Sequence, residues 1–86
     1  MAKLSVIVPA YNAETTLRTA VESILSQQVP GLEIIIVNDG STDATDKICH
    51  ELASQNQCIH VITQKNAGIF AARNRGLEAA SGEFLT

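Results

Sequence analysis

Three short segments of the chain carry side chains whose chemistry suits a nucleotide. Tyr11 offers a flat aromatic face on which a base could stack. Asp39 offers a carboxylate that could accept hydrogen bonds from a base imide N–H or a ribose hydroxyl. Arg73, in the Ala-rich stretch that follows Asn66, could reach a base edge or a diphosphate. Stacking, hydrogen-bond acceptance and charge pairing together are the chemistry of nucleotide binding.

Each of these residues also has a purely structural interpretation. Tyr11 could cover the end of a sheet, because buried aromatic side chains more often serve packing. Asp39 could organise an Asx turn or a helix cap around Gly40. Arg73 could lie in a solvent-exposed turn, since most charged residues are exposed. Asp43 is expected inside the first turn of a helix, where it would interact with the helix dipole rather than with a ligand.

The elements that must position these segments follow from the spacing of apolar residues. Short, nearly continuous apolar runs predict buried strands, and apolar residues three and four apart predict helices. Pro9 is expected to close the first strand, Ser41 or Thr42 to cap the second helix, and Ser81-Gly82 to stop the third. The predicted strands are 4–8, 34–37, 58–63 and the start of a fourth at 83–86. The predicted helices are about 14–28, 43–57 and 69–80.

Strict alternation of strands and helices predicts a three-layer α/β fold. Right-handed crossovers would place the strands parallel in one sheet with helices on its faces. In such a sheet every loop that follows a strand emerges at the same edge, where ligands usually bind. The three polar segments are therefore expected to meet. Gly76 would let the last helix lie close to the sheet.

Composition limits the classes of function. The chain has 86 residues and a net charge of −3 with scattered basic residues, which argues against nucleic acid and anionic membrane surfaces as partners. Its apolar runs are shorter than a membrane span, and it shows no signal peptide. Cys49 and Cys58 are expected to be free thiols in a reducing compartment, so a cytoplasmic location is predicted. His50 and His60 lack partners at metal-ligand spacing.

Three segments in order, LSVIVPAYNAE, EIIIVNDGSTD and NAGIFAARNRGLEAASGEFL, resemble the opening of a family 2 glycosyltransferase. The resemblance covers essentially the whole chain. It implies a Rossmann-like GT-A fold that binds a nucleoside-diphosphate sugar, most commonly a UDP-sugar. It also implies a divalent metal, Mg²⁺ or Mn²⁺, in the full-length enzyme. The sugar would be transferred with inversion to an unknown acceptor such as a polysaccharide, a lipid or a protein glycan.

Motif position also implies which residues bind the nucleotide sugar. Tyr11 would stack on the base, Asp39 would bind the base or the ribose, and Asn66 would help to complete the pocket. Asn38 departs from the family pattern, which often has an acidic residue there. The full predicted set is Pro9, Ala10, Tyr11, Asp39, Asn66 and Arg73.

The resemblance further implies that residues 1–86 form the N-terminal part of a GT-A domain, about three and a half βα units. The expected Asp-x-Asp metal motif, the catalytic base and the acceptor site would all come later. No catalytic or metal-binding residue is therefore predicted in this chain, which is expected to be inactive by itself.

Two other classes of protein are weaker alternatives. A dinucleotide-binding Rossmann unit would need a G-x-G-x-x-G turn where this chain reads PAYNAET. A non-catalytic nucleotide-binding or assembly module is also possible, with two copies pairing through an exposed sheet edge.

Overall fold

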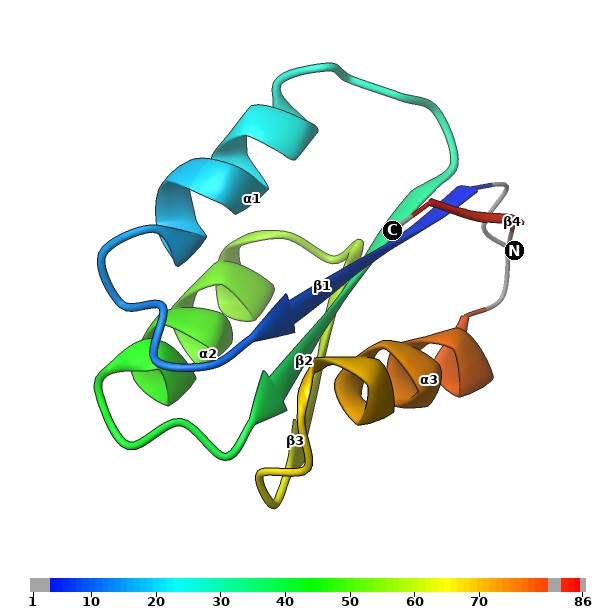
Figure 1. Ribbon diagram of the computed structural model, residues 1–86. Helices are drawn as coiled ribbons and strands as arrows, with labels where there is room; N and C mark the ends of the chain where they lie inside the picture. Colours follow the sequence, from blue (N-terminus) through cyan, green and yellow to red (C-terminus); the bar gives the residue numbers. More distant parts are fainter. Residues whose placement is uncertain (1–3, 81–82, 86) are drawn as a thin grey trace.

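The computed structural model describes residues 4–80 and 83–85. Strands and helices alternate along the chain, as the sequence predicts (Figure 1). The predicted helix stop at Ser81-Gly82 and the last residue of the predicted fourth strand, Thr86, lie outside the described residues. In chain order the elements are β1 (Leu4–Ala10), α1 (Leu17–Leu25), β2 (Leu32–Asp39), α2 (Thr45–Gln55), β3 (Ile59–Gln64), α3 (Ile69–Ala79) and β4 (Glu83–Leu85).

The strands form one parallel sheet in the order β3-β2-β1-β4. In register, Val8 of β1 lies beside Ile36 of β2, and Ile36 lies beside Val61 of β3. Parallel neighbours need a crossover long enough to hold a helix, which is what α1, α2 and α3 supply. The predicted parallel sheet is confirmed, and in Figure 1 the arrowheads of β2 and β3 lie in the lower part of the molecule.

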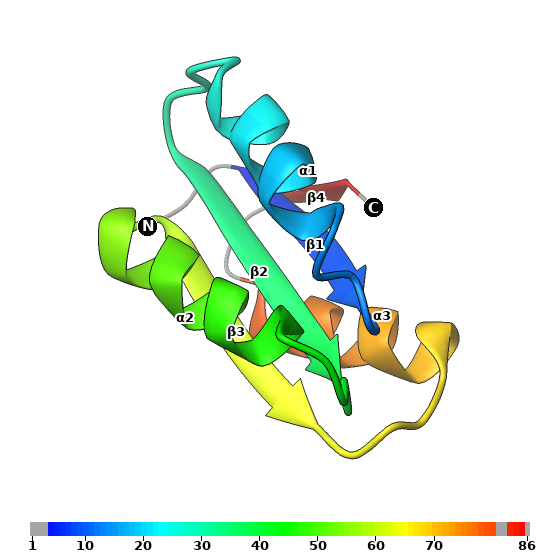
Figure 2. The ribbon, with the colours of Figure 1, turned by 90° about the vertical axis from the view of Figure 1, so that its left-hand side faces the viewer.

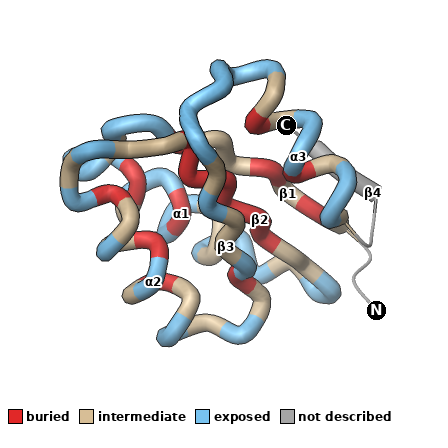
Figure 3. The backbone as a smooth tube through the Cα atoms, turned by 90° about the horizontal axis from the view of Figure 1, so that it is seen from below, coloured by how far each residue is buried: buried red, intermediate tan, exposed pale blue. Residues whose placement is uncertain are grey.

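Helices cover both faces of the sheet. In Figure 2, α1 and α2 lie in front of the sheet and α3 lies behind it. Ile34 and Ile36 of β2 belong to the core under α1 and α2, while Ile35 and Val37 belong to the core under α3. Because both faces are covered, the whole stretch from Ile34 to Asp39 is buried (Figure 3). This explains why residues 34–37 of β2 form a continuous apolar run.

The first strand runs two residues past its predicted end at Val8. Pro9 lies within β1 and pairs in register with Val37, and the strand ends at Ala10. Proline lacks the N–H that a ladder needs, so it is tolerated mainly where pairing is incomplete. Beside β1, β4 pairs only with Leu4 to Val6. Only β2 therefore pairs with β1 at Pro9 within the described part of the chain.

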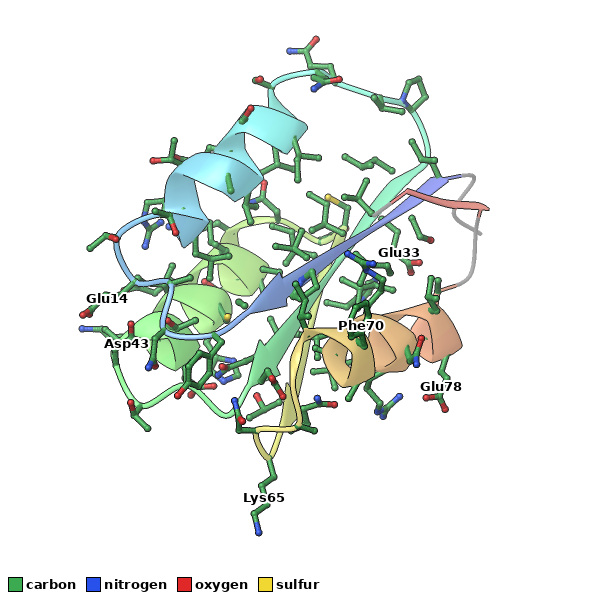
Figure 4. The ribbon with its side chains drawn as sticks, viewed as in Figure 1. Glu14, Glu33, Asp43, Lys65, Phe70 and Glu78 are labelled. Carbon is green, nitrogen blue, oxygen red and sulfur yellow. The ribbon has the colours of Figure 1, made fainter. Side chains whose placement is uncertain are left out.

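The first helix is shorter than predicted. It begins at Leu17 rather than at Glu14 and ends at Leu25. The Glu14 N–H donates to Asp43 at 3.3 Å, and the Glu14 carboxylate accepts from the Ala44 N–H at 3.3 Å (Figure 4). These contacts hold residue 14 in the loop, so helical periodicity alone placed the start too early.

The predicted cap of the second helix is wrong. That helix begins at Thr45 with no side-chain cap at its start. Ser41 and Thr42 instead bind Asn12 of the preceding loop. Asp43 lies before the helix, not inside its first turn, and accepts from the Thr45 N–H at 2.9 Å.

The predicted role of Gly76 is confirmed. A Cβ on this residue would collide with the Cγ2 of Ile7 and come within 3.3 Å of Val37. The absence of a side chain therefore sets how closely α3 lies on β1 and β2.

Candidate nucleotide site

A pocket of about 350 Å³ opens at the carboxyl edge of the sheet, where β1 and β2 end and α3 begins. Pockets of roughly 300 to 1,000 Å³ hold small-molecule ligands in many proteins. The residues that line it are Pro9, Ala10, Tyr11, Asp39, Asn66, Gly68, Ile69 and Ala72.

The pocket brings together five of the six residues predicted to bind the nucleotide sugar. The sixth, Arg73, lies outside the lining, although its neighbour Ala72 belongs to it. The Arg73 Nε is buried, and no described group accepts a hydrogen bond from it. Sequence reasoning missed Gly68, Ile69 and Ala72 as lining residues. The sequence feature that could have identified them is their position around the first turn of the predicted helix at 69–80.

Tyr11 directly follows β1 and is 54% exposed. Such exposure does not fit the structural interpretation, in which the ring would be buried against the end of the sheet. An accessible aromatic ring on a pocket wall is suited to stacking on a planar ligand.

Hydrogen bonds fasten the loop after β1 to the loop after β2. The Asn12 N–H donates to the Ser41 hydroxyl at 3.0 Å, and the Asn12 side-chain oxygen accepts from the Thr42 N–H at 2.8 Å. The Ala13 N–H donates to the Thr45 hydroxyl at 2.8 Å. Asn12 adopts a φ of +48°, in the left-handed region that asparagine tolerates better than most residues. The loop that carries Tyr11 is thus held to the loop after Asp39.

Asp39 ends β2 and is only 3% exposed. Its Oδ1 accepts from Gln64 Nε2 and from the Ala67 N–H, both at 2.9 Å. Its Oδ2 accepts from the Gly68 N–H at 3.0 Å and, more weakly, from Asn66 Nδ2 at 3.4 Å. The carboxylate therefore holds the loop between β3 and α3 against the end of β2.

These bonds set the charge of Asp39. The hydrogen bond from Gln64, with those from the Ala67 and Gly68 N–H groups, outweighs the opposing effect of burial and holds the pKa of Asp39 below its ordinary value of 3.8. The pocket wall therefore carries a full negative charge at neutral pH.

Gly40 allows the loop between β3 and α3 to approach the end of β2. A Cβ on Gly40 would lie 2.5 Å from the backbone nitrogen of Asn66, and the residue has a φ of +71°. Both features call for glycine. In addition, the Asn66 side-chain amide donates to the backbone carbonyl of Asp39 at 3.0 Å.

Asn38 has a structural reason to be an amide rather than an acid. Its side chain is 1% exposed; Oδ1 accepts from the Ser41 N–H at 3.2 Å, and Nδ2 donates to Asp46 at 3.1 Å. A carboxylate could accept the first bond but could not donate the second. The side chain that bonds to the backbone of the turn around Gly40 is thus that of Asn38, which accepts from the N–H three residues on, and not that of Asp39.

The histidines and cysteines lie away from the pocket lining. His50 is 3.4 Å from Asp46, and His60 is 3.5 Å from Glu33. Both cysteines are free, and burial, assisted by the charge of Asp46, raises the pKa of Cys49 to about 11. Within residues 4–80, no group of three or more His, Cys, Asp or Glu side chains could hold a metal ion. The helices of the described region are too short and too polar to cross a membrane.

Comparison with known proteins identifies the family. The profile of Glycosyl transferase family 2 matches residues 5–86. The chain belongs to this family. Among the relatives of this family 2 chain, Glycosyltransferase GlyA of Streptococcus pneumoniae is 49% identical over 84 residues, which cover 98% of the chain and 12% of GlyA.

Solved structures agree with this assignment. S. aureus TarS in complex with UDP-GlcNAc superposes with a TM-score of 0.86 at 33% identity, over 96% of this chain and 26% of that one. The mannosyltransferase PcManGT from Pyrobaculum calidifontis, in complex with GDP-Man and Mn²⁺, superposes with a TM-score of 0.85 at 26% identity, over 92% of this chain and 24% of that one. The fold is that of the GT-A glycosyltransferases. This family 2 chain spans about a quarter or less of the length of these relatives.

Proposed function

We propose that the pocket binds the nucleotide part of a nucleoside-diphosphate sugar, as the donor site of an inverting glycosyltransferase. One observation supports this most strongly. In a family 2 chain, an exposed aromatic ring from the loop after β1, a charged carboxylate at the end of β2 and an amide from the loop after β3 surround one pocket of about 350 Å³. A flat, hydrogen-bonding ligand such as a nucleoside suits this combination.

Each of the six residues predicted from the sequence has a role in this proposal. Tyr11 stacks on the base, with Pro9 and Ala10 framing it. Asp39 accepts a hydrogen bond from the base imide or from a ribose hydroxyl, and Asn66 closes the pocket beside it. Arg73, outside the lining but one residue after Ala72, approaches the diphosphate from α3.

We propose a uridine nucleotide as the preferred ligand. The TarS structures, which bind UDP and UDP-GlcNAc, are 32% and 33% identical to this chain. PcManGT, which binds GDP-Man, is 26% identical. The sugar would pass to a hydroxyl of a glycan or lipid acceptor.

For the whole protein we propose a divalent cation, Mg²⁺ or Mn²⁺, and a cytoplasmic location. PcManGT was solved with Mn²⁺, and such a cation neutralises charge on a leaving diphosphate. Residues 4–80 offer no cluster suited to it, so no residue of this chain is assigned to the metal. Free Cys49 and Cys58 accord with a reducing compartment. Pairing of two copies through an exposed sheet edge also stays a proposal.

Calorimetric titration of the chain with UDP tests the donor site. Tyr11→Ala and Asp39→Ala are each expected to weaken binding, the first by about 1–3 kcal/mol, the range found when a stacking aromatic is removed. Phe70→Ala and Glu78→Gln are the matched controls, because both residues are exposed and lie outside the pocket lining (Figure 4). Unchanged UDP binding in both test variants would contradict the site, and equal binding of GDP would contradict the choice of base.

A further inference from the structure

The four donors that contact Asp39 are divided between its two carboxylate oxygens. Oδ1 accepts from Gln64 Nε2 and the Ala67 N–H, both at 2.9 Å. Oδ2 accepts from the Gly68 N–H at 3.0 Å and from Asn66 Nδ2 at 3.4 Å.

This division coincides with the wall of the pocket. Asn66 and Gly68, which contact Oδ2, line the pocket, whereas Gln64 and Ala67, which contact Oδ1, do not. Oδ2 is therefore the oxygen on the pocket side, and Oδ1 is held by groups that lie outside the pocket lining.

The two oxygens also differ in their remaining capacity for hydrogen bonds. A carboxylate oxygen has about two lone-pair sites, so two bonds of 2.9 Å occupy Oδ1 fully. On Oδ2 the contact from Asn66 is long, and the same amide makes a shorter bond, 3.0 Å, to the backbone carbonyl of Asp39. Oδ2 can thus accept a hydrogen bond from a ligand without losing a strong one.

We propose that Gln64 is a positioning residue for nucleotide binding: its amide fixes the Asp39 carboxylate from outside the pocket, so that Oδ2 is presented to the ligand. This inference rests on the proposed function of the pocket. Gln64 is suited to the task because it is the last residue of β3 and pairs in register with Asp39. A supporting side chain on a strand is held more rigidly than one on a loop.

Neutral groups, among them the Gln64 amide, hold the Asp39 carboxylate in position. Every hydrogen bond found on Asp39 in the described part of the chain comes from a neutral amide or a backbone N–H. Lys65, next to Gln64, projects from the loop into solvent (Figure 4). Tyr11 shares the pocket wall, and Arg73 lies outside it. In agreement, Gln64 makes the largest contribution to the lowered pKa of Asp39.

The test compares Gln64→Leu with the control Gln57→Leu, since Gln57 is exposed and outside the pocket lining. Carbon-detected NMR titration of the ligand-free chain is expected to show a higher pKa for Asp39 in Gln64→Leu, and no change in the control. UDP affinity at pH 7 should fall about three- to tenfold in Gln64→Leu only, the range for loss of one ordinary hydrogen bond, because Gln64 acts on the ligand only through Asp39. In an Asp39→Asn background, Gln64→Leu should cause no further loss.

An unchanged pKa of Asp39, or UDP binding that is equal or tighter in Gln64→Leu, overturns the inference. If Gln64→Leu does not fold, a measurement on the wild-type chain tests the inference. On addition of UDP the side-chain amide signals of Asn66 should shift, while those of Gln64 keep their positions. A shift of the Gln64 signals would mean that the base of UDP displaces Gln64 from Asp39, and it would overturn the inference. If the wild-type chain does not bind UDP at all, the proposed function fails, and the Asp39 titration alone decides whether Gln64 controls the carboxylate.

Discussion

The two polar side chains at the end of β2 bind different parts of the structure. Asn38 makes the local turn, and Asp39 reaches across to Gln64, Ala67 and Gly68, at least 25 residues away in sequence. The sequence offered a turn or a ligand contact as alternatives for Asp39. The structure shows a third role, in which the carboxylate holds the loop between β3 and α3 and still presents one oxygen to the pocket.

At the residue scale, Asn38→Asp tests why an amide is present. The new carboxylate cannot donate to Asp46 and would be placed 3.1 Å from its oxygen in a position that is 1% exposed. We expect the free energy of unfolding to fall by about 1–3 kcal/mol at pH 7, measured by urea denaturation. The control is Asn74→Asp at an exposed position of α3, which should change little. Equal stability of Asn38→Asp and the wild type would contradict the role of the amide.

At the scale of elements, α3 is positioned by the small residues on the side that faces the sheet. Ala72 is fully buried against Ile7 and Val37, and Gly76 lies one turn further along. The same helix supplies Ile69 and Ala72 to the pocket. Close packing of α3 therefore also sets the width of the pocket.

Gly76→Ala tests this packing. Alanine favours a helix over glycine by about 1 kcal/mol, but its Cβ would meet the side chain of Ile7. We expect overpacking to prevail and the free energy of unfolding to fall by about 1–3 kcal/mol in urea denaturation. UDP affinity should fall as well, because the helix must move away from the sheet. Asn74→Ala, on an exposed position of the same helix, is the control. If Gly76→Ala is at least as stable as the wild type, a Cβ fits between α3 and the sheet, and the role given to Gly76 is contradicted.

At the scale of the whole molecule, the three loops of the site support one another. Asn12 and Thr45 join the loops after β1 and β2, and Asp39 joins β2 to the loop after β3. Loops that follow parallel strands share one edge, so side chains distant in sequence become partners. Folding and assembly of the site are therefore coupled.

Low pH should weaken the hydrogen bonds that join the loops of the site. Burial acts to raise the pKa of Asp43, but hydrogen bonds from the Thr45 hydroxyl, the Thr45 N–H and the Glu14 N–H together outweigh it, and the pKa of Asp39 is lowered too. Because both carboxyls take up protons more readily in the unfolded chain, their stabilising effect is complete above the ordinary pKa of 3.8 and is lost as the pH falls through the lower folded values.

Urea denaturation between pH 7 and pH 3 measures this effect. The free energy of unfolding of the wild type should fall more steeply below about pH 4 than that of the double variant Asp39→Asn/Asp43→Asn. Parallel pH dependence in the two proteins would show that other groups control acid stability.

The order of the elements, the parallel sheet and the edge at which the polar segments gather could all be predicted from the sequence, because apolar spacing indicates which side of each element is buried. The sequence also indicated five residues that line the pocket and the close approach at Gly76. Three features became clear only from the folded chain: α1 starts at Leu17, Arg73 lies outside the lining, and the two oxygens of Asp39 have different partners. The start of α1 and the partners of Asp39 depend on hydrogen bonds between segments that are far apart in sequence, and local patterns carry no information on which donor will meet which acceptor.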